Sequence, residues 1–213
     1  MIRVVLVDDH ELVRTGFRMI LAQQTGIEVI GEAADGEDGL ALIRASKPDV
    51  AIVDVHMPRL SGIELTERVR KLKLKTRIVI LTMVSEAPFP KRLIEAGASG
   101  YLTKGGAADE LVRAVRQVAE GKRYLSPDIA AALALEQIDG RGDSVFDALT
   151  TRELDVALML SRGDGMQDIA AHLKLSAKTV ATYKYRLFEK LGIDNTIALA
   201  NLARRHGLLD EPA

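Results

Sequence analysis

Five polar residues of this chain stand where they could together hold a divalent metal ion and a phosphoryl group. Asp8 and Asp9 follow the first apolar run, Asp54 and Thr82 each close a later one, and Lys104 ends the segment Gly-Tyr-Leu-Thr-Lys. Mg²⁺ is bound in proteins by one or two carboxylates together with waters and phosphate oxygens. A carboxylate beside such a metal can attack a phosphoryl group, while an ammonium neutralises the charge that develops on the phosphoryl oxygens. The residue types therefore indicate phosphoryl transfer, with Asp54 as the nucleophile.

The elements that must position these residues are apolar strands that alternate with helices. Strands are predicted at residues 2–7, 27–32, 50–54, 77–82 and 99–102, and helices at 11–24, 36–46, 62–73, 88–96 and 107–121. Strands made almost entirely of Val, Ile and Leu are typical of a parallel sheet with both faces covered. The expected fold class is α/β, with a doubly wound five-stranded parallel sheet over residues 1–122. Ligands of such sheets bind beyond the carboxyl ends of the strands, where the five polar residues would meet.

Each of these residues, taken singly, also has an ordinary explanation. Asp8 could be a solvated loop residue, Thr82 a strand-end threonine and Lys104 a surface charge. The combination favours a site, because several strand ends supply it and because carboxylates this close repel one another unless a cation lies between them. We interpret His56, which lies beside the site, as a side chain that shapes water access rather than as a side-chain metal ligand.

The composition excludes several classes of protein. The chain of 213 residues has no cysteine, so neither a disulfide framework nor a thiolate zinc site can form. No apolar run approaches the roughly 20 residues that a membrane helix needs, and the first residues lack the pattern of a signal peptide. We therefore expect a cytoplasmic protein with no membrane segment. The net charge of −1 does not by itself indicate a nucleic-acid partner.

The alternation of strands and helices stops after Gly121. Residues 123–147 are the expected linker, with a short Ala-rich helix over 128–138 and a polar, flexible stretch over 139–144. Residues 148–213 keep only helical periodicity, which predicts a small all-α domain. Two helices separated by a break at Lys174 form a helix-turn-helix pattern, and Ser176 is the expected N-cap of the second helix.

The second helix of this pattern has an apolar face and a basic face. Val180, Leu187 and Leu191 share the apolar face at the helical period. Such a helix can enter the major groove, with its early residues at base edges and its lysines and arginines at phosphates. The candidate DNA-binding residues are Lys178, Thr179, Ala181, Thr182, Lys184, Tyr185, Arg186 and Lys190. The alternative is an amphipathic helix whose basic face is merely solvated.

Residues 1–122 resemble the receiver domain of response regulators, on the motifs described above. The resemblance implies that Asp54 is the phosphoacceptor, that Lys104 faces the phosphate, and that Thr82 and Tyr101 form a switch pair. It also implies a Mg²⁺ site, whose ligands would be Asp8, Asp9, Asp54 and the backbone carbonyl of His56.

Two positions depart from the usual receiver pattern. Met83 follows Thr82, where many receivers have a small residue, so access to the acyl phosphate would be narrower. Gly105 follows Lys104, where many receivers have a cis-proline, so the sequence does not fix the geometry of that peptide bond.

Residues 148–210 resemble a LuxR/FixJ-type output domain. The likeness lies in Leu149-Thr-x-Arg-Glu153, Asp168-Ile-Ala-x-x-Leu173 and Ser176-x-Lys-Thr-Val180. It implies that the last helix, over 197–206, carries the contact between the two copies of an active homodimer. The dimerisation residues would be Ile197, Ala198, Asn201, Leu202 and Arg205.

Over its whole length the chain is similar to the NarL/FixJ class of two-component response regulators. Within this class it resembles the GacA/UvrY branch, through Val7-Asp-Asp-His-Glu-Leu-Val-Arg-Thr-Gly16 and Tyr183-Lys-Tyr-Arg-Leu-Phe-Glu-Lys-Leu191. The similarity implies a transcription regulator rather than an enzyme, with a hybrid sensor histidine kinase of the GacS/BarA kind as phosphodonor. Phosphorylation of Asp54 would release the C-terminal domain, which would dimerise on double-stranded promoter DNA.

Two other functions stay open on the residues alone. A phosphatase with an aspartyl nucleophile would need a second acid two residues beyond Asp54, where His56 stands. A DNA-binding protein that works without phosphorylation would use its first domain only to dock other proteins. Turnover of phosphate esters would favour the first, and normal function of an Asp54→Ala variant would favour the second.

Overall fold

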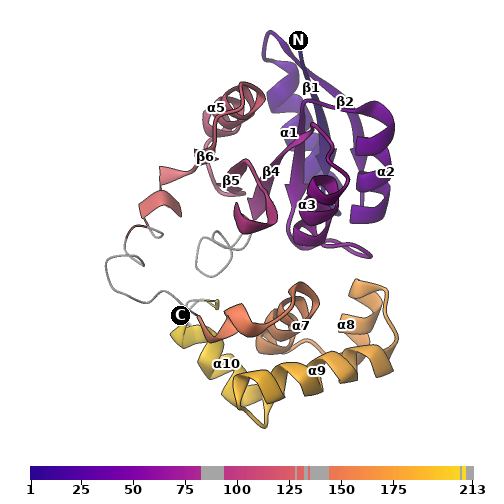
Figure 1. Cartoon of the computed structure of the whole chain (residues 1–213), viewed down its shortest axis with the longest axis vertical. Helices are drawn as coiled ribbons and strands as arrows, with labels where there is room; N and C mark the ends of the chain where they lie inside the picture. The colour runs from indigo at the N-terminus through magenta and orange to yellow at the C-terminus, as the bar shows by residue number, and fades with distance from the viewer. Residues whose placement is uncertain (83–93, 128, 132–133, 135–143, 207, 210–213) are drawn as a thin grey trace. The chain divides into compact units, whose positions relative to one another are not determined.

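The computed structural model of this chain describes residues 1–82, 94–127, 129–131, 134, 144–206 and 208–209 (Figure 1). These residues form two compact units, the first within residues 1–131 and the second within residues 134–209. The strands belong to the first unit, and the regular elements described in the second unit are helices.

The first unit is built on a parallel sheet with the strand order β2-β1-β3-β4-β5-β6. The strands are β1 (Ile2–Val7), β2 (Ile27–Ala33), β3 (Val50–Asp54), β4 (Arg77–Thr82), β5 (Gly100–Thr103) and β6 (Tyr124–Leu125). The helices are α1 (Glu11–Ala22), α2 (Gly36–Ser46), α3 (Gly62–Lys71) and α5 (Ala108–Ala119). The strand order reverses at β1, so the carboxyl ends of β1 and β3 lie at the topological switch point where such sheets bind ligands.

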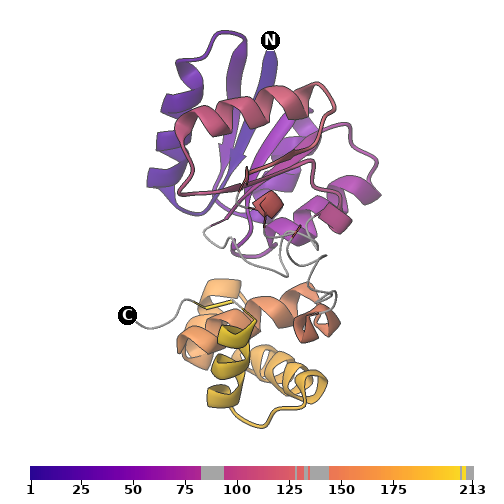
Figure 2. The ribbon, with the colours of Figure 1, turned by 90° about the vertical axis from the view of Figure 1, so that its left-hand side faces the viewer.

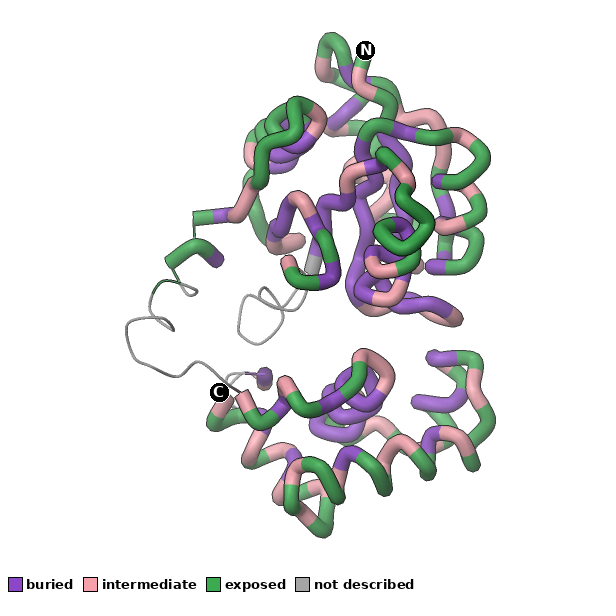
Figure 3. Tube along the Cα trace, in the orientation of Figure 1, coloured by how far each residue is buried: buried purple, intermediate pink, exposed green. Residues whose placement is uncertain are grey.

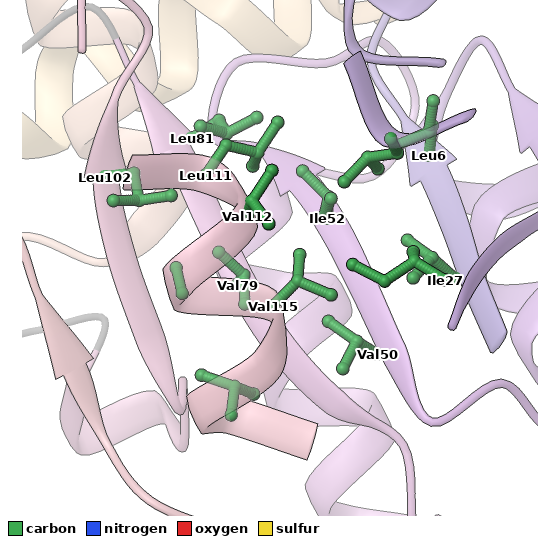
Figure 4. Close-up of a cluster of buried hydrophobic side chains, with 14 residues drawn as sticks. Leu6, Ile27, Val50, Ile52, Val79, Leu81, Leu102, Leu111, Val112 and Val115 are labelled. Carbon is green, nitrogen blue, oxygen red and sulfur yellow. The ribbon is translucent and has the colours of Figure 1, made fainter. Parts of the chain in front are cut away.

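Helices cover both faces of this sheet. On one face, alternate residues of the central strands pack against α5 and against Leu21 of α1, and Figure 2 shows α5 in front of the strands. Figure 4 shows this cluster, whose labelled members include Leu6, Val50, Ile52, Val79, Leu81, Leu111, Val112 and Val115. On the other face α2 packs against β1, where Gly39 lies so close to Val7 that a Cβ would overlap the valine. The predicted doubly wound architecture is confirmed.

The connection from β3 to α3 is a tight loop that begins at Asp54. The backbone N–H of Gly62 donates to the carbonyl of Val55 at 2.9 Å, and a Cβ on Gly62 would overlap the carbonyl oxygen of Asp54. Ser61 caps α3 through a capping box with Glu64. Because this hydrogen bond, the close packing at Gly62 and the cap of α3 hold the loop, the backbone of Asp54, which ends β3, is fixed.

The sheet has one strand more than the five that the sequence predicts. Tyr124 and Leu125 form β6 beside β5, with the Tyr124 N–H donating to Ser99 O at 3.0 Å and the Ser126 N–H to Tyr101 O at 3.1 Å. An open β5 edge would leave these carbonyls without a sheet partner. The first residues of the predicted 123–147 linker therefore belong to the sheet. Helices are also predicted at 88–96 and 128–138, and most residues of each lie outside the described part of the chain.

The second unit packs its helices around α7. Its elements are the 3₁₀ turn η1 (Val145–Ala148) and the helices α7 (Thr151–Arg162), α8 (Met166–Leu173), α9 (Ala177–Leu191) and α10 (Thr196–Arg205). Figure 3 shows α7 largely buried, and Phe146, Val180, Leu187 and Leu199 complete the core of the second unit. None of the helices described in either unit combines the length and the apolar character that crossing a bilayer requires.

The predicted helix-turn-helix is confirmed as α8 and α9. Lys174 ends α8 in the left-handed conformation, with φ of 52°. The Ser176 side chain then caps α9, accepting from the Thr179 N–H at 3.1 Å. Thr150 caps α7 through a capping box with Glu153. Local polar residues therefore set where these helices begin.

Candidate functional site

Three buried charged side chains meet at the carboxyl ends of β1, β3 and β5. The Lys104 Nζ lies 2.7 Å from Asp8 Oδ2 and 3.0 Å from Asp54 Oδ1. All three side chains are at most 8% exposed. Asp8 directly follows β1, Asp54 ends β3 and Lys104 directly follows β5. The structure thus brings together three of the residues that the sequence analysis placed at one point.

Asp9 and His10 extend this cluster toward the surface. The His10 Nδ1 lies 2.9 Å from Asp9 Oδ1 and 3.3 Å from Asp8 Oδ1, and the imidazole is 66% exposed. Ligand atoms of Asp8, Asp9 and His10 all lie within 4.8 Å of one another. His10 is not among the site residues predicted from the sequence, although its position directly after two acids was a usable signal.

The donor set of this pocket fits a divalent metal ion. Asp8, Asp9 and Asp54 with the one ammonium of Lys104 leave a net charge of −2 when all four groups are ionised. Carboxylate oxygens are hard donors of the kind that Mg²⁺ prefers. A divalent cation beside Asp8 and Asp9 would offset the repulsion between the acids.

Burial controls the protonation of Asp54. Removal from solvent raises the pKa of this carboxyl from its ordinary 3.8 to about 6; the Lys104 ammonium opposes that rise, and the carboxylates of Asp8 and Asp9 add to it. Burial lowers the pKa of Lys104, but Asp54 and Asp8 outweigh it, so that the pKa of Lys104 lies above its ordinary value. At neutral pH Asp54 is therefore a carboxylate, as a nucleophile must be, and Lys104 is an ammonium.

The loop after β3 folds back on Asp54. The His56 backbone N–H donates to Asp54 Oδ2 at 3.2 Å, which leaves Oδ1 facing Lys104. Arg59, in the left-handed conformation with φ of 66°, reaches the first turn of α2, where it pairs with Asp35 and with Asp38. The loop is thereby tied to a second element of the sheet domain. That the His56 carbonyl binds a metal stays a prediction.

The predicted switch residues lie on β4 and β5. Thr82 ends β4 and pairs in register with Thr103, while its side chain lies outside the described part of the chain. Tyr101 pairs with Ile80, and it is completely buried. That Tyr101 and Thr82 form a switch pair stays a prediction. Met83 lies outside the described residues.

The second candidate surface is the outward face of α9. Val180 and Leu187 are buried, as predicted for the apolar face, whereas Leu191 is half-buried. Of the candidate DNA-binding residues, the exposed ones are Lys178, Ala181, Thr182, Tyr185, Arg186 and Lys190, and the half-buried ones are Thr179 and Lys184. The Lys184 Nζ lies 5.3 Å from the centre of the Phe188 ring, which is a cation–π contact.

Lys190 has an intramolecular partner that the sequence analysis did not foresee. Its Nζ lies 2.6 Å from Oε2 of Glu153, which is only 3% exposed. Burial pushes the pKa of Glu153 up, but the hydrogen bonds from Lys190 and from Thr150 outweigh this effect and hold the pKa below its ordinary value. Lys190 therefore ties α9 to α7, and its predicted phosphate contact stays a prediction.

The helix α10 presents the predicted dimerisation residues to different degrees. Ile197 is 73% exposed. Asn201 and Arg205 are also exposed, whereas Ala198 and Leu202 are half-buried. That these residues contact a second copy of the chain stays a prediction.

The two units match two known families of domain. Residues 4–116 match the response regulator receiver domain, and residues 147–203 match the bacterial regulatory proteins of the luxR family. The chain is 48% identical over 211 residues to the response regulator GacA of Pseudomonas aeruginosa, which covers 99% of each chain. It is 45% identical over 209 residues to the response regulator UvrY of Escherichia coli, which covers 98% of this chain and 96% of the relative.

A solved structure extends the comparison to the fold of the whole chain. The complex of the two-component response regulator RcsB with DNA matches at a TM-score of 0.61 and 28% identity. The match covers 95% of this chain and 98% of that chain.

A receiver-type acidic pocket on a parallel sheet, followed by a LuxR-type helical unit, defines the class of two-component response regulators. The chain belongs to this family, and within it to the regulators with a LuxR-type domain that include GacA and UvrY. It is a phosphorylation-dependent transcription regulator, and the family is not one of classical enzymes. Receiver domains generally bind Mg²⁺ at an acidic pocket and act with a sensor kinase.

Proposed function

We propose that Asp54 accepts the phosphoryl group and that Lys104 faces the transferred phosphate. The observation that carries this proposal is the buried Lys104 ammonium, which lies 2.7 Å from Asp8 and 3.0 Å from Asp54. An ammonium held beside the acceptor can neutralise the charge that develops on the phosphoryl oxygens. The two oxygens of Asp54 have different partners, because Oδ2 accepts from the His56 N–H while Oδ1 faces Lys104. Oδ1 is therefore the attacking oxygen.

Asp8, Asp9, Asp54 and the backbone carbonyl of His56 would hold Mg²⁺ in this pocket. When bound, the ion neutralises charge on the phosphoryl oxygens and orients the group for in-line transfer. The acids are held for this task by the chain itself, since the His10 N–H donates to Asp8 Oδ1 at 2.9 Å. A pocket with a net negative charge supports a metal ion as the missing counter-charge.

The transfer forms a bond between Asp54 Oδ1 and phosphorus and breaks the bond between phosphorus and the imidazole of a phosphohistidine donor. The resemblance to the GacA/UvrY branch supports a hybrid sensor kinase of the GacS/BarA kind as that donor. The Thr82 hydroxyl then donates to the acyl phosphate. Tyr101 senses this change from its buried position on β5.

The output is the binding of promoter DNA by a homodimer. The exposed face of α9, with Lys178, Thr182 and Tyr185, would enter the major groove. Ile197 and its exposed neighbours on α10 would contact the second copy. The likeness to RcsB, whose complex with DNA is known, supports this use of the second unit.

The test uses the full-length protein, an Asp54→Asn variant and a matched control, Asp49→Asn. Asp49 is an exposed acid at the opposite end of the same strand, where its carboxylate accepts from the Arg3 backbone N–H. With acetyl phosphate and Mg²⁺, the wild type and Asp49→Asn should take up one phosphoryl group per chain, and Asp54→Asn none. The affinity for genomic DNA fragments that the wild type binds should rise on phosphorylation in the first two proteins only.

Each other outcome contradicts a stated part of this proposal. Labelled Asp54→Asn would mean that another residue accepts the phosphoryl group. Equal DNA affinity of phosphorylated and unphosphorylated wild type would show that the modification does not control binding. Steady turnover of phosphate esters by the wild type would favour the phosphatase.

A further inference from the structure

The two acids after β1 depend on the geometry of one peptide unit. Asp8 is the first residue beyond β1, and its N–H still donates to Ala33 O of β2 at 3.2 Å. Because the peptide bond is planar, the direction of the Asp8 carbonyl fixes the plane that joins Asp8 to Asp9. Whatever holds this carbonyl therefore also sets the directions in which the two carboxylates leave the backbone.

Arg14 of α1 holds this carbonyl. Its Nη1 donates to Asp8 O at 2.6 Å. The Arg14 side chain is only 14% exposed, so a partner is needed for its buried charge, and Glu32 of β2 supplies it, with Oε2 3.4 Å from Arg14 Nε. One nitrogen of the guanidinium thus pairs with a neighbouring strand while another binds the turn that carries the acids. The planar fork of arginine allows this geometry.

Glu32 also pairs with a second arginine, Arg18, which does not share the contact of Arg14 with the Asp8 carbonyl. Arg18 Nη1 lies 3.2 Å from Glu32 Oε1, and the Arg18 side chain is 54% exposed. Arg18 lies one helical turn beyond Arg14 on α1. The chain therefore offers two arginines with the same acidic partner, of which Arg14 contacts the Asp8 backbone.

We infer that Arg14, anchored by Glu32, is a positioning residue that sets the Asp8–Asp9 pair in the geometry for a divalent metal ion. This inference rests on the proposed metal site and adds a residue to it that touches neither the metal ligands' carboxylates nor the phosphoryl group. Partners that orient metal ligands are worth about 10-fold to 100-fold in metal affinity when they are removed.

The sign of the change in Mg²⁺ affinity on loss of Arg14 distinguishes a positioning role from an electrostatic one. Loss of the positive Arg14 near three carboxylates makes the pocket more negative, so Coulomb's law alone predicts tighter Mg²⁺ binding. Loss of the carbonyl contact frees the Asp8–Asp9 peptide and predicts weaker binding. We expect Arg14→Ala to bind Mg²⁺ about 10-fold more weakly than the wild type, in spite of the more favourable charge.

The experiment is a Mg²⁺ titration of the full-length chain, followed by the NMR signals of the amides of residues 8–10, together with thermal unfolding without metal. Arg18→Ala is the matched control; its dissociation constant should stay within about twofold of the wild-type value, because an exposed charge is screened. Arg14→Lys keeps the charge and a single donating nitrogen in place of the guanidinium fork, and it should recover part of the lost affinity. Glu32→Gln leaves Arg14 in place without its anchor, and it should weaken binding less than Arg14→Ala.

The possible results distinguish failure of the proposed metal site from failure of the positioning role of Arg14. If the amides of the wild type do not respond to Mg²⁺, the proposed metal site itself fails. If the wild type responds and Arg14→Ala binds equally well or more tightly, the positioning role is overturned. Equal weakening by Arg18→Ala would also overturn it, because that arginine does not make the contact with Asp8. If Arg14→Ala does not fold, Arg14→Lys and Glu32→Gln decide, and wild-type affinity in both would refute the inference.

Discussion

The acidic pocket of the first unit and the outer face of α9 in the second use charge in opposite ways. In the pocket, side chains at the ends of three strands are buried and directly paired, with Lys104 at 2.7 and 3.0 Å from two carboxylates. The outer face of α9 is formed by a single helix, and most of its polar side chains are exposed. A buried charge depends on its partner, whereas an exposed one is screened by solvent. Single substitutions should therefore be severe in the pocket and graded on the helix.

The largest effect is expected for Lys104→Ala. Removal of one preorganised donor to a developing negative charge typically costs about 10² to 10³ in rate. The initial rate of phosphorylation by acetyl phosphate at saturating Mg²⁺ should fall by that factor. Lost metal binding would not explain the fall, because the pocket becomes more negative. Lys122→Ala is the control, since this lysine is 66% exposed and pairs with the nearby Glu120. An unchanged rate in Lys104→Ala would remove Lys104 from the proposed chemistry.

The contrast between the two regions also explains what the sequence could predict. The strand ends at Asp8 and Asp54 follow from runs rich in Val and Ile, and the strand before Lys104 follows from the alternation of strands and helices. These ends meet because parallel strands end at one edge of a sheet. The contact of Arg14 with a backbone carbonyl leaves no trace in residue types. The strand β6 has only two residues, and its pairing depends on the open edge of β5 rather than on periodicity.

The same limit applies on α9, where the exposed face could be predicted and one partner could not. Helical spacing alone places Val180 and Leu187 inside. Lys190 pairs with Glu153, which lies 37 residues away in the chain, and a helical wheel of α9 carries no information about α7. The predicted basic face is therefore a set of residues with two different environments.

Lys190→Ala tests this division, with an effect of intermediate size. The substitution leaves the buried Glu153 carboxylate without its ammonium, and the free energy of unfolding at pH 7 should fall by about 1–2 kcal/mol, less than for a fully buried pair because Lys190 is 36% exposed. Urea unfolding of the second unit's helices measures it. Unchanged stability would mean that the pair contributes nothing to the fold.

The same pair predicts a pH dependence with a definite sign. The folded-state pKa of Glu153 lies below its ordinary 4.5. Its contribution to stability is therefore complete above that ordinary pKa, and it is lost as the pH falls through the lower folded-state pKa. Between pH 7 and pH 3 the wild type should lose more stability than Lys190→Ala. Parallel curves for the two proteins would contradict the assignment.

The smallest effect is expected for Lys178→Ala, an exposed residue near the start of α9. Each phosphate contact contributes about 0.9 to the slope of log affinity against log salt concentration, so a nonspecific DNA duplex should show a slope smaller by about 1 and a severalfold weaker affinity at low salt. The free energy of unfolding should not change. Lys190→Ala should lose stability, and an unchanged salt slope in this variant would refute the phosphate contact predicted for Lys190 from the sequence. If both variants lower the salt slope equally, Lys190 leaves Glu153 to bind phosphate, and the two environments on α9 become one on DNA.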